Sequence, residues 1–79
     1  MNNFKKNTIS DNIRSRVKEA KKEYGLKYTH LAREIDLNTI TLYNFISNKQ
    51  SLPFERLMQI NEYINNIEQQ FNELYNKCI

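Results

Sequence analysis

Apolar residues recur at helical spacing along most of this 79-residue chain. Ile13, Val17, Ala20 and Tyr24 fall three or four positions apart, which predicts an amphipathic helix that begins after an N-cap at Ser10 and stops at Gly25. The single glycine and single proline leave little turn chemistry for β-hairpins. The chain is therefore expected to be all-α, with four to five helices.

A tight helix pair is predicted within "YTHLAREIDLNTITLYNFISNK", residues 28–49. The first helix covers about residues 28–35, and Asp36 follows as a turn residue that tolerates left-handed backbone. Asn38 is an N-cap for a second helix over about residues 39–47, which buries Leu42, Phe45 and Ile46. Two helices joined in this way form a helix-turn-helix, whose second helix can enter a DNA major groove.

A third apolar pattern runs from Pro53 to the end of the sequence, without glycine or proline to interrupt it. It predicts one long helix, or two helices divided near Asn65 and Asn66. From Ile67 onward the domain is expected to leave this seam uncovered, which favours a partner helix from a second identical chain. The seam consists of Leu57, Ile60, Ile64, Ile67, Phe71, Leu74 and Cys78.

Charge is distributed unevenly along the chain. Residues 1–50 hold ten Lys and Arg against five acidic residues, and residues 51–79 hold two against four. A polyanion is the natural partner of such a basic segment, because phosphate contacts release counterions. For "RSRVKEAKKE" alone, a solvated helix face is an equally good interpretation.

The composition argues against several other classes of protein. No apolar run approaches the roughly 18 residues of a membrane span, and "MNNFKKNTIS" lacks the apolar segment of a secretory signal, so a soluble, cytoplasmic protein is expected. One cysteine and one histidine make a structural metal site improbable. No catalytic residues are predicted and no cofactor is expected, because the sequence has no catalytic triad pattern and no phosphate-binding glycine loop.

The segments "GLKYTHLAREIDLNTITLYNFISNK" and "LPFERLMQI" resemble the lambda-repressor-like DNA-binding domains, which include the Cro and repressor regulators of phages and bacteria. The resemblance covers about residues 13–64 and includes Leu31, Ala32 and Pro53. It departs from the family where Asp36 and Asn48 replace glycines, and where Tyr28 replaces a glutamine that commonly clamps a phosphate and braces the first base-reading residue. Those glycines are replaced by residues that can still adopt left-handed backbone.

The resemblance implies a DNA-binding face on the second helix of the pair. Asn44 matches a position that can pair with adenine, and Ile40 matches one that can meet a thymine methyl. The base-reading set is Thr39, Ile40, Thr41, Tyr43 and Asn44, and the phosphate-contacting set is Tyr28, Asn38, Ser47, Asn48 and Lys49. Tyr43 is equally well explained as a half-buried packing residue, and Asn48 as a helix cap.

The predicted organisation is a flexible tail over residues 1–9, a DNA-binding domain over 10–66 and a helical dimerisation segment over 67–79. The dimer interface is expected at Ile67, Phe71, Leu74 and Cys78. The predicted function is sequence-specific transcription regulation, as a phage or mobile-element repressor that binds a palindromic operator as a homodimer. The alternative is a protein-interaction module with the same fold, such as a phage-borne inhibitor or antitoxin.

Overall fold

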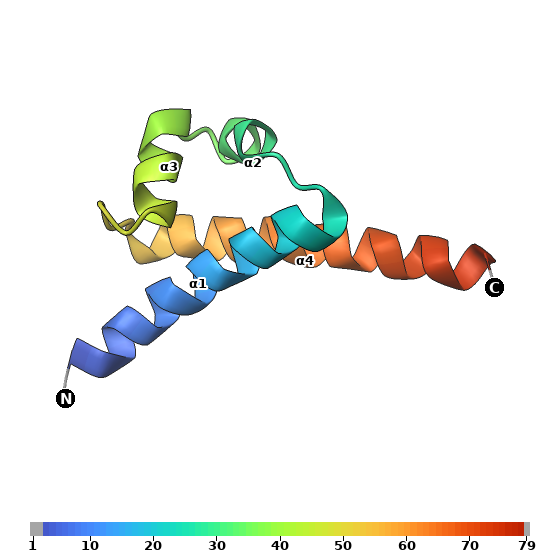
Figure 1. The fold of residues 1–79 in the computed structure, drawn as a ribbon, viewed down its shortest axis with the longest axis horizontal. Coiled ribbons are helices and arrows are strands. Elements are labelled where there is room, and N and C mark those ends of the chain that lie inside the picture. Colours follow the sequence, from blue (N-terminus) through green and yellow to red (C-terminus); the bar gives the residue numbers. More distant parts are fainter. Residues whose placement is uncertain (1–2, 79) are drawn as a thin grey trace.

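The computed structural model describes the backbone of residues 3–78 and the side chains of residues 9–76, and this part of the chain is all-helical. It contains α1 (Asn3–Tyr24), α2 (Tyr28–Glu34), α3 (Thr39–Ile46) and α4 (Phe54–Cys78). Helix α1 packs on α4, and α2 packs on α3. The short helices α2 and α3 lie on one side of α4, as Figure 1 shows. The predicted all-α class is confirmed, with four helices in the described residues.

Helix α1 begins earlier than predicted. The N-cap predicted at Ser10 is wrong, because α1 is helical from Asn3 and includes most of the range assigned to a tail. No glycine or proline interrupts residues 3–9, and Ile9 precedes Ile13 by one helical turn, so nothing local stops the helix from continuing.

Gly25 ends α1 as predicted. Its φ of 72° lies in the left-handed region that favours glycine. The Gly25 N–H donates to the carbonyl of Lys21, and the Leu26 N–H donates to the carbonyl of Ala20. These bonds satisfy the last carbonyls of the helix and direct the buried Leu26 into the core.

The turn between α2 and α3 also follows the prediction. Asp36 adopts a φ of 54°, and the Leu37 N–H donates to the carbonyl of Ala32 over 2.8 Å. Asn38 caps α3, since its Oδ1 accepts a hydrogen bond from the Ile40 N–H at 2.8 Å. Asn48 adopts a φ of 64° just after α3, which is the left-handed backbone that it was expected to tolerate. Local chemistry thus fixes both ends of α3.

One apolar core joins all four helices. Phe45 of α3 is the largest of the fully buried side chains among the described residues. The core is small for a stable domain, so each of its members matters to folding. Its buried members are Ile13, Val17, Ala20, Leu26, Leu31, Ala32, Ile35, Leu42, Phe45, Ile46, Leu52, Leu57, Ile60 and Ile64.

Helix α4 is continuous from Phe54 to Cys78, which resolves the open choice between one helix and two. The prediction that its seam is uncovered from Ile67 onward is wrong for Ile67, which packs against the core. Phe71 also packs on α1, since its ring centroid lies 4.7 Å from that of Tyr24. Its side chain nevertheless remains 44% exposed. The seam was predicted to lose cover too early because the sequence did not show that Tyr24, in the last turn of α1, packs on Phe71 of α4. Leu74 is 60% exposed, and the Cys78 side chain lies outside the described residues.

Arg56 of α4 binds the turn that joins α2 to α3. Its Nη1 donates to the carbonyl of Ile35, and its Nη2 donates to the carbonyl of Asp36 at 3.4 Å. Both carbonyls follow the last residue of α2, where a helix leaves acceptors without intrahelical partners. Arg56 therefore holds the α2–α3 pair against the amino-terminal part of α4.

Arg56→Ala is expected to lower the free energy of unfolding by about 2 kcal/mol, because two carbonyls lose a charged donor. Urea denaturation followed by circular dichroism measures this change. Glu55→Ala, at the exposed neighbouring position, is the matched control and is expected to change stability little. An equal loss in both variants would remove the assigned role from Arg56.

Candidate nucleic-acid interface

The outward face of α3 presents polar and apolar side chains without charge. Ile40 is 70% exposed and Tyr43 is 46% exposed, whereas Thr39, Thr41 and Asn44 are partly buried. The helix from Thr39 to Ile46 contains no acidic or basic residue. The five residues predicted to read bases thus share one short helix, and each keeps some exposure. Hydrogen-bonding groups and methyl groups on such a face match the chemistry of base edges.

Tyr28 connects this face to α1 and α2. Its ring meets Tyr43 edge-on at 5.2 Å between centroids, and the Nζ of Lys21 lies 4.6 Å from its centroid. Burial raises the pKa of Tyr28, and the nearby Tyr43 raises that pKa further. The hydroxyl therefore stays neutral and remains able to donate a hydrogen bond at neutral pH. Tyr43 packs on Tyr28 and keeps part of its surface exposed, as expected of a half-buried packing residue.

The other predicted phosphate-contacting residues lie at the two ends of α3. Asn38 stands before the helix, and its Oδ1 is occupied by the cap. Ser47, Asn48 and Lys49 follow the helix and are all exposed. The backbone N–H of Lys49 donates to the carbonyl of Asn44 at 2.8 Å, which fixes the path of the chain after α3. The structure therefore gathers these residues around the same helix.

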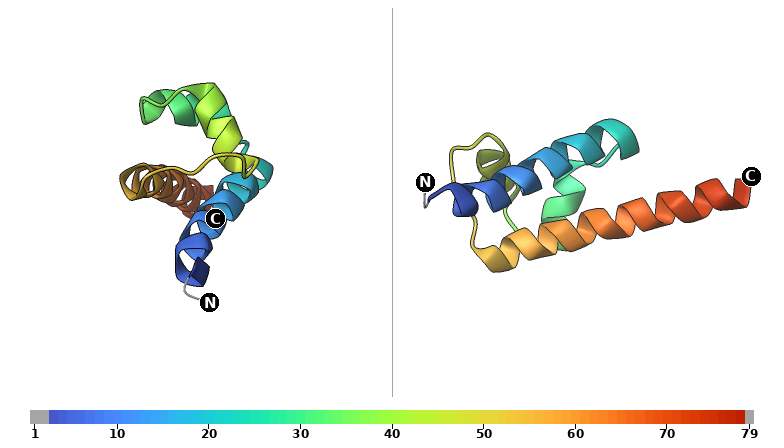
Figure 2. Two further views of the ribbon diagram at one scale, coloured as in Figure 1. Left: turned by 90° about the vertical axis from the view of Figure 1, so that its left-hand side faces the viewer. Right: turned by 90° about the horizontal axis from the view of Figure 1, so that it is seen from below.

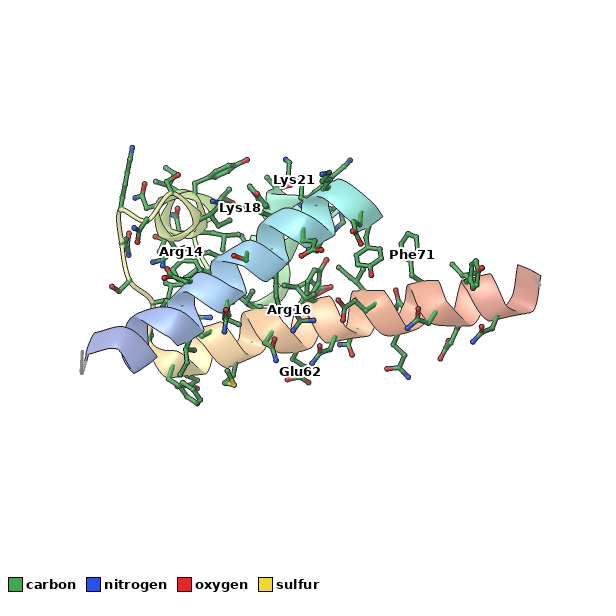
Figure 3. All side chains as sticks on the ribbon, turned by 60° about the horizontal axis from the view of Figure 1, so that its bottom comes forward. Arg14, Arg16, Lys18, Lys21, Glu62 and Phe71 are labelled. Atoms are coloured by element: carbon green, nitrogen blue, oxygen red, sulfur yellow. The ribbon has the colours of Figure 1, made fainter. Side chains whose placement is uncertain are left out.

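The basic residues of α1 divide into two faces. Arg14 donates from Nε to the carbonyl of Phe45 at 2.6 Å, and its guanidinium lies 4.4 Å from the centre of the Phe45 ring. Lys18 and Lys21 follow on the same side of α1, one turn and two turns later (Figure 3). Both lysines are exposed, and Lys21 reaches the α3 face through the ring of Tyr28, which contacts Tyr43. They were not named as site residues from the sequence, although their spacing from Arg14 placed them on one helical face.

Arg16 points to the opposite side of α1 and is committed to α4. It donates to Oδ1 of Asn61, to Oδ1 of Asn65 at 3.0 Å and to Glu68 at 2.9 Å. Figure 3 shows its side chain directed toward α4. Part of the basic segment "RSRVKEAKKE" is therefore structural, and the exposed positive charge on the Arg14 side of α1 comes from lysines.

Comparison with known proteins adds no relative, since no family model, no curated protein and no solved structure matches the chain. None of the helices described here has a stretch long and apolar enough to cross a membrane. Among the described residues, no three His, Cys, Asp or Glu side chains gather closely enough to hold a metal ion.

Lys49→Ala is expected to weaken binding to every duplex sequence alike, several-fold, if Lys49 contacts a phosphate. The slope of log affinity against log salt concentration should then fall by about one phosphate contact. Fluorescence anisotropy at a series of salt concentrations measures both quantities. Arg33→Ala, at an exposed position in the last turn of α2, serves as the control with an equal charge change. An unchanged slope would place Lys49 outside the interface.

Proposed function

We propose that this chain is a sequence-specific DNA-binding protein of the lambda-repressor-like kind, which reads the major groove with α3 and regulates transcription as a homodimer. The observation that carries the proposal is the α2–turn–α3 unit with its uncharged outward face on α3. Backbone geometry at Asp36 and the cap at Asn38 present that face in a single orientation. A recognition helix needs such an orientation to align side chains with base edges.

The lysines around α3 support binding to a polyanion. Lys21 lies over the ring of Tyr28, which contacts Tyr43 of α3, and Lys18 is exposed one turn earlier on the same face of α1. Lys49 follows the carboxyl end of α3. Lysine side chains position a protein on the phosphate backbone without reading sequence. The uncharged face between them then supplies the base contacts. Asn44 pairs with adenine in this proposal, and Ile40 contacts a thymine methyl.

Pairing of two chains follows from the short reach of one recognition helix. Regulators of this kind combine two half-sites about one helical turn apart to gain specificity. Leu74 and Tyr75 are the most exposed apolar side chains in the carboxyl-terminal part of α4. This part of α4 extends beyond α1, as the view from below in Figure 2 shows. We therefore assign the dimer contact to it.

A protein partner is the second candidate function, and the exposure of Ile40 and Tyr43 favours it. Two exposed apolar side chains on one short helix can form the centre of a protein interface. In this case α3 would bind a groove on another protein, and duplex DNA would not compete for it.

Binding to a mixed-sequence duplex over a range of salt concentrations tests the proposal. The expected result is measurable binding at low salt that weakens steeply as salt is added. Ile40→Lys is a useful variant, because it adds a charge to α3 and should strengthen nonspecific DNA binding while it disrupts an apolar protein interface. Absence of binding at low salt for both proteins would favour the second candidate.

A further inference from the structure

A groove of about 490 Å³ runs beside α4, between that helix and the end of α2. Ile35 and Ile67 are the apolar residues of its lining, which is otherwise polar and includes Glu34, Glu62 and Tyr63. Burial raises the pKa of Tyr63, and the charge of Glu34 raises that pKa further, so the hydroxyl remains neutral beside the carboxylates. The DNA-binding face assigned to α3 does not include these residues.

The exposed end of α4 continues directly from this groove. Tyr63, Ile67, Gln70 and Leu74 follow one another at steps of four, three and four residues, which places them along one side of the helix. The groove reaches Gln70. Leu74 lies one turn farther on and is 60% exposed. One side of α4 thus carries Ile67, an apolar residue of the groove, and the exposed apolar side chain of Leu74.

We propose that the groove receives Leu74 of a second copy of this chain, so that two α4 helices pair antiparallel with the two-fold axis near Gln70. The proposal rests on the pairing of chains in the proposed function and specifies its geometry. A two-fold axis across α4 brings each Leu74 beside Ile67 of the other chain, and each contact is made twice. Both grooves are then filled by the residues that the single chain leaves exposed.

Charge favours this direction over a parallel pairing. A parallel pair would set each acidic residue of α4 beside its own copy, including Glu62 next to the groove and Glu73 near the exposed end. Like charges at such spacing are destabilising. In the antiparallel pair, position 62 lies opposite position 78, and position 73 lies opposite position 67. No carboxylate of α4 then faces its own copy.

Spacing also favours the antiparallel pair. Helix α3 stands over the first turns of α4 (Figure 1), and Leu57 lies in those turns. An α-helix rises 1.5 Å per residue, so Leu57 and Gln70 are about 20 Å apart along the axis. The two α3 helices of the pair are thus separated by roughly 40 Å along α4, which is close to the 34–36 Å between half-sites one DNA turn apart. A parallel pair would give no separation along this direction.

Single-cysteine crosslinking tests the proposal on the full-length chain with Cys78 replaced by serine. Gln70→Cys lies at the two-fold axis and is expected to form a disulfide-linked dimer under mild oxidation. Leu74→Cys is the comparison, because its two copies lie about 12 Å apart along the axis by the helical rise. Disulfides need Cα atoms within about 7 Å, so Leu74→Cys is expected to remain largely uncrosslinked.

A parallel pair would crosslink both variants alike, and that result would overturn the proposal. Absence of crosslinking in both variants would overturn it as well. Sedimentation of the reduced Gln70→Cys protein checks that the dimer forms without the disulfide. A monomer at tens of micromolar would also contradict the proposed pairing. DNA binding is measured separately on the same proteins. If the Gln70→Cys protein binds duplex DNA but forms no crosslink, the proposed function stands and the proposed interface is wrong.

Discussion

Leu74→Asp is expected to convert the dimer into monomers and to weaken binding to a palindromic site roughly 100-fold, the usual gain from linking two binding events. Leu74 is exposed in the single chain, so aspartate at this position costs the monomer little stability. In the dimer the same carboxylate would enter a groove that already holds Glu34 and Glu62, where like charges repel and an unpaired charge is costly. Binding to a single half-site should change little.

Sedimentation and anisotropy on the two DNA sites measure these effects. Phe54→Asp is the matched control, because Phe54 is 62% exposed and lies at the opposite end of the same helix. This variant is expected to keep both the dimer and the palindromic affinity. Equal losses on the palindrome and on the half-site would show that Leu74 acts on the DNA contact or on folding, and would remove it from the dimer interface.

Asn44→Ala is expected to lower affinity for the preferred site by roughly 1 to 3 kcal/mol and to relax preference at one base pair of each half-site. The side-chain amide can donate and accept with adenine at the same time, and alanine can do neither. Competition with duplexes that carry each base pair at that position measures the change. Affinity for unrelated sequences should stay the same, because phosphate contacts remain.

Asn72→Ala removes the same amide from an exposed position on α4 and is the control for Asn44→Ala. It is expected to leave both affinity and base preference unchanged. Uniform weakening of Asn44→Ala on all sequences would assign Asn44 to the phosphate backbone or to the structure of α3.

The sequence predicted the elements that depend on local chemistry. The left-handed residues Gly25 and Asp36 and the cap at Asn38 act within a few positions of themselves, and the structure confirms each of them. The start of α1 was predicted wrongly for a related reason. Ser10 is a good N-cap only where the preceding residues leave the helix, and nothing in residues 3–9 makes them do so.

The structural roles of Arg14 and Arg16 could not be predicted from the sequence. Arg14 contacts Phe45 and Arg16 contacts Glu68, residues far away in the chain. A count of charges cannot separate such structural arginines from lysines that face solvent. The contact of Lys21 with Tyr28 was missed in the same way, because it depends on how α1 meets α2.

Candidate site residues on α3 were predictable as a group, because one helix places them together. Their exposure depends on how α3 packs on the core through Leu42 and Phe45. The groove beside Ile35 and Ile67 was not predictable, since α2 and α4 form it from distant parts of the chain.

Selection of bound duplexes from a pool of random DNA sequences tests the central claim, that α3 reads base edges. The expected result is one enriched motif with two-fold symmetry and half-sites about one helical turn apart. The Asn44→Ala protein should yield the same motif with one position relaxed in each half. Recovery of no motif by the unaltered protein at low salt, where phosphate contacts are strongest, would contradict the claim.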